Sequence, residues 1–401
     1  HFTRSAGFLF GGVLGRRSSR GSNVTTMLVP RRFPGSTAGP NRALSSQSAE
    51  SEVEPLVFLP SLMALLVALA HESNDIIRDV AQSDDLGVID KKLAPETIRS
   101  QLGDLQTEAD RRVEARILDV LRAQYPFVRI IAEEETETQQ TAAAGDVSTA
   151  PPPTVDGEVE RMPWNGNTPV ESSRVVVYVD PLDGTNEFAS GNFELCTTLL
   201  GVCVDGKPMG GVIGQAFFNL RRDEDGKAHR DDLAATPGRV VYGGPGVGVH
   251  GLEEHSRSSA STSPQLIVGL NRGVRDERIE PAMEKLKSSL PSDQSIRISR
   301  GSASGWHCLQ LMEQKHDVYL HLRAGTKKWD TAPGEAMLDA MGGRLTNVAG
   351  ERYQYDGNHH KNISGVVASL CNETHATALI AIEGVVAQYV RDTDDPSVRK
   401  V

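Results

Sequence analysis

Two carboxylates stand three positions apart in residues 180–185, which read DPLDGT and follow the apolar run 175–179. A near-continuous apolar run predicts a buried strand, so we expect Asp180 at its carboxyl end. Gly184 lets the backbone approach a ligand closely, and the helical stretch expected from Thr185 would offer N–H groups to a phosphate. Hard oxygen ligands of this kind favour Mg²⁺ or Mn²⁺ over zinc.

Three further acids stand at the ends of expected elements. Glu133 comes just after an expected strand over 127–131, and Asp104 and Asp330 stand where helices are expected to start. Each has a plain structural alternative, because acids commonly cap helices, and a D-G-T triplet alone is a common turn. Acids at four element ends nevertheless favour a shared cation site over unrelated caps.

The elements that must position these acids can be read from the hydrophobic pattern. Ala109, Val113, Ile117 and Leu121 recur every four residues and predict a helix that ends at Pro126. The glycine-rich run 243–248 lacks the Gly-Lys-Ser/Thr ending of a phosphate loop, so we interpret it as a turn between strands. Further strands are expected over 199–204, 210–216 and 265–270, with a hairpin turn at 205–207 and a last helix over 376–389.

Four segments, in the same order along the chain, resemble the motifs of the inositol monophosphatase superfamily. They are residues 104–110 (DLQTEAD), 131–134 (IAEE), 180–185 (DPLDGT) and 329–332 (WDTA). The first segment and the run KKWD over 327–330 most resemble the 3'(2'),5'-bisphosphate nucleotidase branch of that superfamily. The resemblance extends from about Leu56 to Leu370, and it implies a layered αβαβα sandwich of the α+β or α/β class.

The resemblance also implies a magnesium site with two or three ions. Their implied ligands are Glu133, Asp180, the carbonyl of Leu182, Asp183 and Asp330, with Asp104 holding a further, weaker ion. It implies in addition that Asp104 and Thr185 together activate the attacking water. Such a site is physically consistent, because converging carboxylates cannot all stay ionised without cations between them. Paired ions would also attract the phosphate and lower the pKa of a bound water.

The substrate contacts that the resemblance implies are Gly184, Thr185, Arg272, Ser304, His307 and Asp330. Three positions depart from the family pattern: Ala132 replaces a usual glycine, Val274 a histidine of the nucleotidase branch, and His307 a lysine that can contact the substrate phosphate. A histidine at position 307 could carry positive charge at mildly acidic pH. Exposed arginines in the same segments either have no role or substitute as phosphate ligands, because a guanidinium grips phosphate through two hydrogen bonds. They are Arg272, Arg275 and Arg323.

Three functions remain open. The first is a phosphomonoesterase that removes the 3'-phosphate of 3'-phosphoadenosine 5'-phosphate or of its sulfated relative, 3'-phosphoadenylyl sulfate. The second is an inositol (poly)phosphate phosphatase, and the third is a non-catalytic member that binds metal and ligand as a sensor. Loss of a metal carboxylate or of Thr185 would favour the sensor, and all are present. The resemblance favours the first, a lithium-sensitive hydrolase of nucleotide metabolism and sulfur assimilation.

The charge and composition of the chain limit its partners. The formal net charge is −11, and residues 1–49 carry seven arginines and no acid, which leaves about −18 for the rest. So acidic a body disfavours a nucleic-acid polymer as partner, and we expect a small phosphorylated substrate, adenosine bisphosphate above all. The apolar stretch 56–70 is shorter than the ~20 residues of a membrane-spanning helix, so we expect a core helix. Four cysteines without a C-x-x-C pair favour reduced, buried thiols over zinc ligands.

Composition also divides the chain. Residues 1–50 are rich in Arg, Ser and Gly, which is typical of a transit peptide for a mitochondrion or plastid; a disordered leader on a cytoplasmic protein is the alternative. Residues 51–262 are expected to form an N-terminal α+β domain that carries most metal ligands. Within it, the Thr-, Ala- and Pro-rich residues 136–173 are expected to form a mobile loop. Residues 263–395 are expected to form a C-terminal α/β domain.

Overall fold

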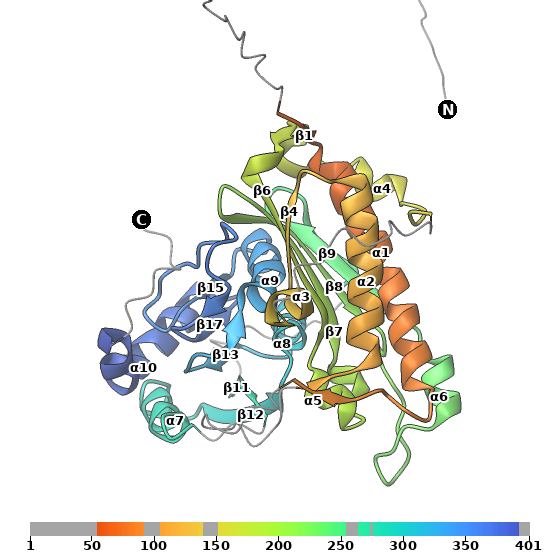
Figure 1. Ribbon diagram of the computed structural model, residues 1–401. Helices are drawn as coiled ribbons and strands as arrows, with labels where there is room; N and C mark the ends of the chain where they lie inside the picture. The colour runs from red at the N-terminus through yellow and green to blue at the C-terminus, as the bar shows by residue number, and fades with distance from the viewer. Residues whose placement is uncertain (1–53, 92–104, 139–150, 254–263, 273–275, 393–401) are drawn as a thin grey trace, which may run out of the picture. The chain divides into compact units, whose positions relative to one another are not determined.

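The computed structural model describes residues 54–91, 105–138, 151–253, 264–272 and 276–392 (Figure 1). The described residues belong to one compact unit, which carries two sheets. The domain boundary expected near residue 262 falls between the last strand of one sheet and the first strand of the other. Asp104, Val274, Arg275 and the leader over 1–50 lie outside the described ranges, so the predictions for them stay predictions.

A six-stranded sheet, in the order β10–β9–β8–β7–β6–β4, is built from the first part of the unit. Only the pair β4–β6 is parallel among its described pairings; the other neighbours run antiparallel. The strands are β4 (Arg129–Ala132), β6 (Val175–Asp183), β7 (Thr197–Val204), β8 (Lys207–Gln215), β9 (Arg239–Gly244) and β10 (Gly248–His250).

A five-stranded sheet, in the order β12–β11–β13–β17–β15, follows in the second part. Its strands are β11 (Gln265–Asn271), β12 (Ser295–Gly301), β13 (Val318–His321), β15 (Arg344–Thr346) and β17 (Val366–Ser369). Short antiparallel pairs tie the ends of other segments: β1 (Leu56–Val57) with β5 (Val170–Glu171), β2 (Ile89–Asp90) with β3 (Leu105–Gln106), and β14 (Thr326–Lys327) with β16 (Lys361–Asn362).

Helices separate and cover the two sheets. Long helices α1 and α2 pack on one face of the six-stranded sheet, α8 and α9 lie between the sheets, and α7 and α10 cover the far face of the five-stranded sheet (Figure 1). The helices are α1 (Leu59–Ala81), α2 (Glu108–Gln124), α3 (Glu133–Thr138), α4 (Gly157–Glu160), α5 (Thr185–Ala189), α6 (Arg230–Ala235), α7 (Ile279–Ser288), α8 (Ser304–Met312), α9 (Lys328–Ala340) and α10 (Asn372–Asp392).

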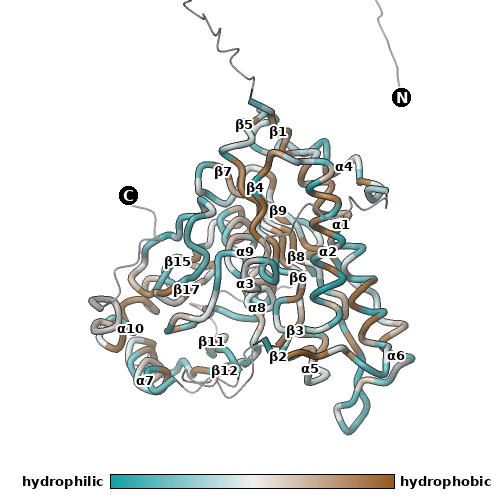
Figure 2. The backbone as a smooth tube through the Cα atoms, in the orientation of Figure 1, coloured by the Kyte–Doolittle hydropathy of each residue, from teal (hydrophilic) through white to brown (hydrophobic). Residues whose placement is uncertain are grey.

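The buried apolar side chains form three clusters, one beside each of the three layers of helices. The first lies between α1, α2 and the six-stranded sheet, the second around α8 and α9, and the third beneath α7 and α10. Figure 2 shows the hydrophobic colour gathered in α1 and in the strands of the six-stranded sheet. The order of layers is therefore α, β, α, β, α, which confirms the expected sandwich.

The hydrophobic pattern located the main elements well. The four-residue apolar repeat lies on the buried face of α2, where its residues are at most 1% exposed. The turn expected at 205–207 joins β7 to β8, and the glycine-rich run 243–248 spans the end of β9 and the turn into β10. Among the described helices, none has the length and apolar character to cross a membrane. None of the four cysteines, all of which lie in the described residues, forms a disulfide bond, and three of them are buried.

The loop expected over 136–173 has more structure than its composition suggests. Residues 136–138 are the end of helix α3, and residues 151–173 contain α4, the 3-10 helix η1 (Trp164–Asn167), β5 and the start of the 3-10 helix η2 (Ser172–Arg174). Trp164 is buried, and its indole nitrogen donates to the carbonyl of Val159, 3.1 Å away. Burial of this large aromatic side chain, together with that of Val159 and Val170, stabilises this polar stretch.

Candidate active site

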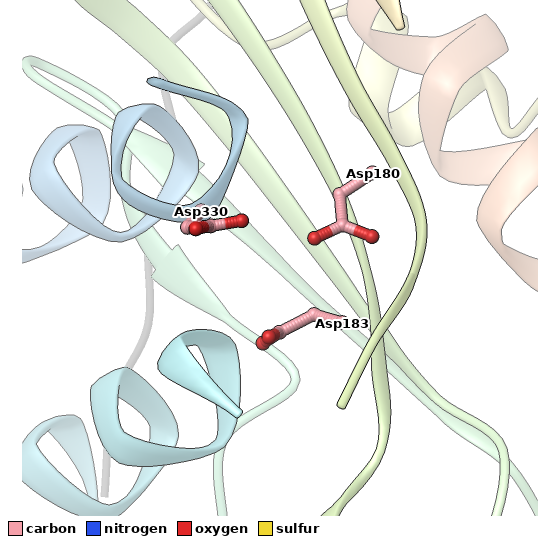
Figure 3. Close-up of side chains that lie close together, drawn as sticks. All are labelled: Asp180, Asp183 and Asp330. Carbon is pink, nitrogen blue, oxygen red and sulfur yellow. The ribbon is translucent and has the colours of Figure 1, made fainter. Parts of the chain in front are cut away.

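Three aspartates from two distant segments face one another between the sheets. Asp180 and Asp183 come from β6, and Asp330 lies in the first turn of α9 (Figure 3). Each offers a carboxylate oxygen, and these oxygens all lie within 4.8 Å of one another. Hard carboxylate oxygens brought together at such a spacing suit a divalent cation such as Mg²⁺.

An irregularity in β6 puts the two strand aspartates on the same side. The strand does not end before Asp180 as expected but continues to Asp183. Asp180 pairs with Leu199 and Asp183 with Thr197, so three steps on β6 match two on β7. In a regular strand, residues three apart face opposite sides; the extra residue of a bulge returns Asp183 to the face of Asp180.

Asp330 lies three residues further into its helix than a cap would. The N-cap of α9 is Lys327, and Asp330 Oδ2 accepts the Lys327 backbone N–H at 2.7 Å. The plain structural alternative for Asp330, a helix N-cap, is therefore wrong. An acid in the first turn still gains from the positive end of the helix dipole.

Glu133 reaches the cluster from the neighbouring parallel strand. Ala132, the last residue of β4, is paired with Val179. The residues that follow, Glu133 and Asp180, are therefore neighbours, and a side-chain hydrogen bond joins them. The fourth predicted carboxylate thus lies beside the three aspartates.

Burial and mutual repulsion destabilise the ionised form of these carboxylates. Burial first, and then the charge of Glu133 and of the other two aspartates, raises the pKa of Asp180 well above its usual range. Burial, followed by the charge of Asp330, raises the pKa of Asp183 to about 7. A divalent cation would remove this conflict by pairing with the ionised carboxylates, so the donor set fits the Mg²⁺ that the sequence predicts.

The N-terminus of α8 fixes the orientation of Asp183. Its Oδ1 accepts the backbone N–H of Ser304 at 3.1 Å, and its Oδ2 accepts that of Gly305 at 2.6 Å. The hydroxyl of Thr197 also donates to Oδ2, at 3.0 Å. The close contact between the N-terminus of α8 and Asp183 needs a glycine at position 305, because a Cβ there would lie 2.4 Å from Thr197 Oγ1. Ser304, a predicted substrate contact, therefore lies at the metal cluster.

The hydroxyl of Thr185 contacts Asp110. Its Oγ1 lies 3.1 Å from Asp110 Oδ1 and also 3.1 Å from the carbonyl oxygen of Leu182, a predicted metal ligand. The sequence predicted Asp104 as the partner of Thr185, but the carboxylate found there is Asp110, six residues later. Asp104 itself lies outside the described residues.

The four-residue apolar repeat of α2 could have identified Asp110 as a buried carboxylate. It lies one turn before Val113 and next to Ala109, both on the buried face of α2, and it is only 1% exposed. Its Oδ2 accepts the backbone N–H of Thr107 at 2.7 Å and the Thr107 hydroxyl at 2.5 Å, so only Oδ1 faces Thr185. Burial raises the pKa of Asp110, which makes the carboxylate a readier proton acceptor.

Helix α2 also supports Glu133 through a second carboxylate that the sequence analysis missed. Glu114, one turn after Asp110, accepts the backbone N–H of Glu134 and that of Glu135, each at 2.9 Å. It therefore caps the N-terminus of α3, the helix that Glu133 begins. One helix thus positions both the partner of Thr185 and a predicted metal ligand.

The remaining predicted substrate contacts differ in their surroundings. Gly184 caps α5 with φ at 93°, in the left-handed region that favours glycine. Arg272 is half-exposed and pairs with Glu187. Arg323, just beyond β13, has a buried Nε that has no hydrogen-bond partner among the described residues.

His307 lies in the core and not at a ligand site. It is fully buried, its ring stacks on Tyr319 with centroids 4.3 Å apart, and its Nε2 is 3.1 Å from the carbonyl of Gly301. Burial, followed by the nearby His316, lowers the pKa of His307 to about 3. The expectation that it gains charge at mildly acidic pH and contacts the substrate is therefore wrong, because its helix face turns into the protein.

Comparison with known proteins gives a consistent picture. The model of the inositol monophosphatase family matches residues 59–384. The chain is 30% identical to mouse 3'(2'),5'-bisphosphate nucleotidase 1 over 325 residues, which cover 78% of this chain and 92% of the relative. It is 27% identical to the human Golgi-resident adenosine 3',5'-bisphosphate 3'-phosphatase, over 80% and 78% of the two chains. It is 26% identical to inositol monophosphatase 3 of Xenopus laevis, over 78% and 80%.

Solved structures agree on the fold. The structure is similar to inositol monophosphatase II of Staphylococcus aureus, with a TM-score of 0.51 and 18% identity, over 84% of this chain and all of that one. It is also similar to the inositol monophosphatase of Thermotoga maritima, with a TM-score of 0.52 and 16% identity, over 82% and 99%.

Proposed function

Because the chain belongs to the inositol monophosphatase family, a family of metal-dependent phosphomonoesterases, we propose that it removes the 3'-phosphate of adenosine 3',5'-bisphosphate. A sulfated relative of that nucleotide is a second candidate substrate. The observation that carries the chemistry is the meeting of Asp180, Asp183 and Asp330 beside the Thr185–Asp110 pair. The similarity to the mouse nucleotidase over 92% of its length supports the choice of substrate.

The residues of the site fit hydrolysis by an activated water. The three aspartates and Glu133 would hold Mg²⁺, which supplies positive charge that attracts the phosphate and acidifies a bound water. Thr185 Oγ1 takes the proton of the attacking water while giving its own proton to Asp110 Oδ1, 3.1 Å away. The water oxygen forms a bond to phosphorus as the bond to the 3'-oxygen breaks, and the 3'-oxygen takes a proton from solvent.

The competing proposal is an inositol phosphate as substrate. The similarity to inositol monophosphatase 3 of Xenopus laevis favours it. So does the loss of two nucleotidase features, since Val274 stands in place of a histidine, and His307, in place of a lysine, is fully buried. Both proposals share the metal site and differ only in what holds the rest of the substrate.

Substrate preference separates the two. We expect kcat/KM for adenosine 3',5'-bisphosphate to exceed that for inositol 1-phosphate at least tenfold, a difference of about 1.4 kcal/mol. The physical reason is a second phosphate that binds away from the metals and adds binding energy that 3'-AMP lacks. Phosphate release from these three compounds at saturating Mg²⁺ is the measurement. Equal cleavage of 3'-AMP and the bisphosphate, or preference for an inositol phosphate, would reject the nucleotide.

A further inference from the structure

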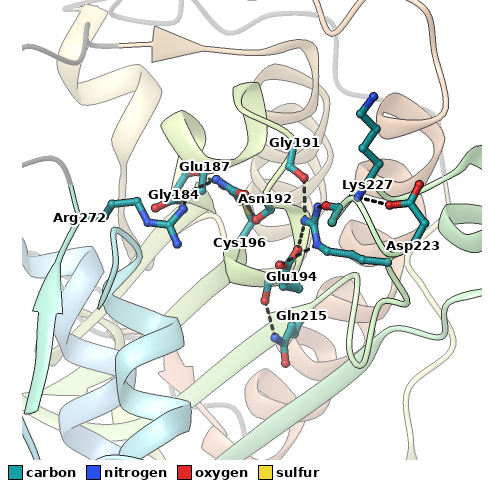
Figure 4. A network of polar contacts seen from close by, with 12 residues as sticks. Gly184, Glu187, Gly191, Asn192, Glu194, Cys196, Gln215, Asp223, Lys227 and Arg272 are labelled. Carbon is teal, nitrogen blue, oxygen red and sulfur yellow. Dashed lines mark hydrogen bonds and ion pairs between the residues drawn. The ribbon is translucent and has the colours of Figure 1, made fainter. Parts of the chain in front are cut away.

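A buried carboxylate outside the metal cluster lies close to it in the chain. Glu187 follows Thr185 by two residues on α5, and its side chain is 4% exposed. Its Oε1 accepts the hydroxyl of Ser302 at 2.8 Å. Its Oε2 accepts Asn192 Nδ2 at 2.7 Å and Arg272 Nη1 at 3.2 Å (Figure 4). Burying a carboxylate is costly unless hydrogen bonds replace its water, and three donors from separate segments do so here.

These contacts connect Arg272 to the segment that orients Asp183. The segment 301–305 is attached to the turn 183–187 by two carboxylates, since Asp183 accepts the N–H groups of Ser304 and Gly305 while Glu187 accepts Ser302. The backbone N–H of Arg272 donates to the carbonyl of Gly301 at 3.0 Å. Arg272, at the end of β11, is therefore joined to the segment that also orients a predicted metal ligand.

The two partners of the ion pair differ in exposure. The Arg272 side chain is 46% exposed, while the carboxylate of Glu187 is buried. Glu187 contacts one nitrogen of a guanidinium that carries five N–H donors, so the exposed part has donors to offer an anion. An ion pair this exposed adds little to stability. Its physical effect is to limit the rotamers of a long side chain before a ligand arrives.

We propose that Glu187 is a positioning residue that orients Arg272 toward the second phosphate of the substrate, while the first phosphate lies at the metals. This inference rests on the proposed function, because it needs a substrate with two phosphates. It adds that recognition of the second phosphate depends on a residue that touches no substrate atom.

The test compares substrates with and without the second phosphate. Steady-state kinetics with adenosine 3',5'-bisphosphate and 3'-AMP would be measured for the natural protein, Glu187→Gln, Arg272→Ala and the double variant. We expect each single variant to raise KM for the bisphosphate about tenfold with a small change in kcat, and to lower the bisphosphate-to-monophosphate ratio of kcat/KM by a similar factor. The double variant should have the same KM for the bisphosphate as Arg272→Ala, because both changes act on the same contact of Arg272 with the second phosphate.

A matched control lies nearby. Glu194, which Figure 4 labels, forms an ion pair with Arg222 and not with Arg272, and Glu194→Gln should leave the ratio unchanged. Ser302→Ala is a second variant that removes one donor to Glu187 without removing its charge, and a smaller rise in KM for the bisphosphate is expected.

The outcomes distinguish this inference from the proposed function. If the natural protein with Mg²⁺ cleaves neither nucleotide, the proposed function fails. If it cleaves the bisphosphate but Glu187→Gln lowers kcat for both nucleotides alike, Glu187 is merely structural and the inference is overturned. The inference is also overturned if the free-energy losses of the two single variants add in the double variant. Should Glu187→Gln not fold, an unchanged ratio in Arg272→Ala would overturn it equally.

Discussion

Replacing Asp183 with alanine is expected to lower kcat/KM for phosphate release about a thousandfold, which corresponds to about 4 kcal/mol of transition-state stabilisation. The change removes one of three carboxylates whose oxygens lie within 4.8 Å of one another, and metal charge in such sites supplies several kcal/mol. The measurement is steady-state phosphate release over a range of Mg²⁺ concentrations, so that weaker metal binding and slower chemistry can be separated.

The control must account for the structural contacts of Asp183, which accepts the N–H groups of Ser304 and Gly305. Asp183→Asn keeps a carbonyl acceptor for one of them and should show a similar loss of activity with a smaller fall in melting temperature. Asp119→Ala removes an exposed aspartate of α2 and should change neither property. Turnover of Asp183→Ala close to that of the natural protein would show that the metal site lies elsewhere.

The second large effect is expected at the Thr185–Asp110 pair. Asp110→Asn and Thr185→Ala should each lower kcat by a factor on the order of 100 to 10,000, the range of general acid–base catalysis. The amide introduced by Asp110→Asn would still accept a hydrogen bond from Thr185 but could take up no proton. KM for the substrate should change little, since the pair acts on the attacking water. Single-turnover kinetics at saturating substrate measures the effect.

The pair is expected to act as one unit. A protein with both substitutions should be hardly slower than the slower single variant, because either change interrupts the same proton transfer. If kcat of the double variant falls by the product of the two single factors, the two residues act independently. If Asp110→Asn kept the full kcat, Asp110 would not be the proton acceptor, and Asp104, the residue first expected in this role, would be tested next.

Local sequence patterns predicted the elements of this fold but not every detail of how they meet. The apolar run over 175–179 located β6, and the four-residue repeat located α2. The bulge that turns Asp183 toward Asp180 depends on pairing with β7, and a pairing between strands leaves little trace in either strand alone. The family motifs supplied the acids, and only the fold could say how their side chains meet.

The sequence could not decide which aspartate contacts Thr185 or where the His307 side chain lies, and the physical reasons differ. The motif at 104–110 contains two aspartates, and the choice between them depends on which one lies on the buried side of α2 near Thr185. His307 stands where the family carries a lysine, yet it stacks on Tyr319 in the core, because an aromatic ring can be buried where an ammonium group reaches out to solvent. Position in a motif does not fix the direction of a side chain.

The central claim is that carboxylates at 180, 183 and 330 hold a divalent cation on which phosphate release depends. The most direct measurement is release of phosphate from adenosine 3',5'-bisphosphate by the purified protein, before and after EDTA, followed by return of Mg²⁺ in excess. The account predicts that activity falls at least a hundredfold in EDTA, by about 2.7 kcal/mol or more, and returns with Mg²⁺. Activity that persists in EDTA would contradict it.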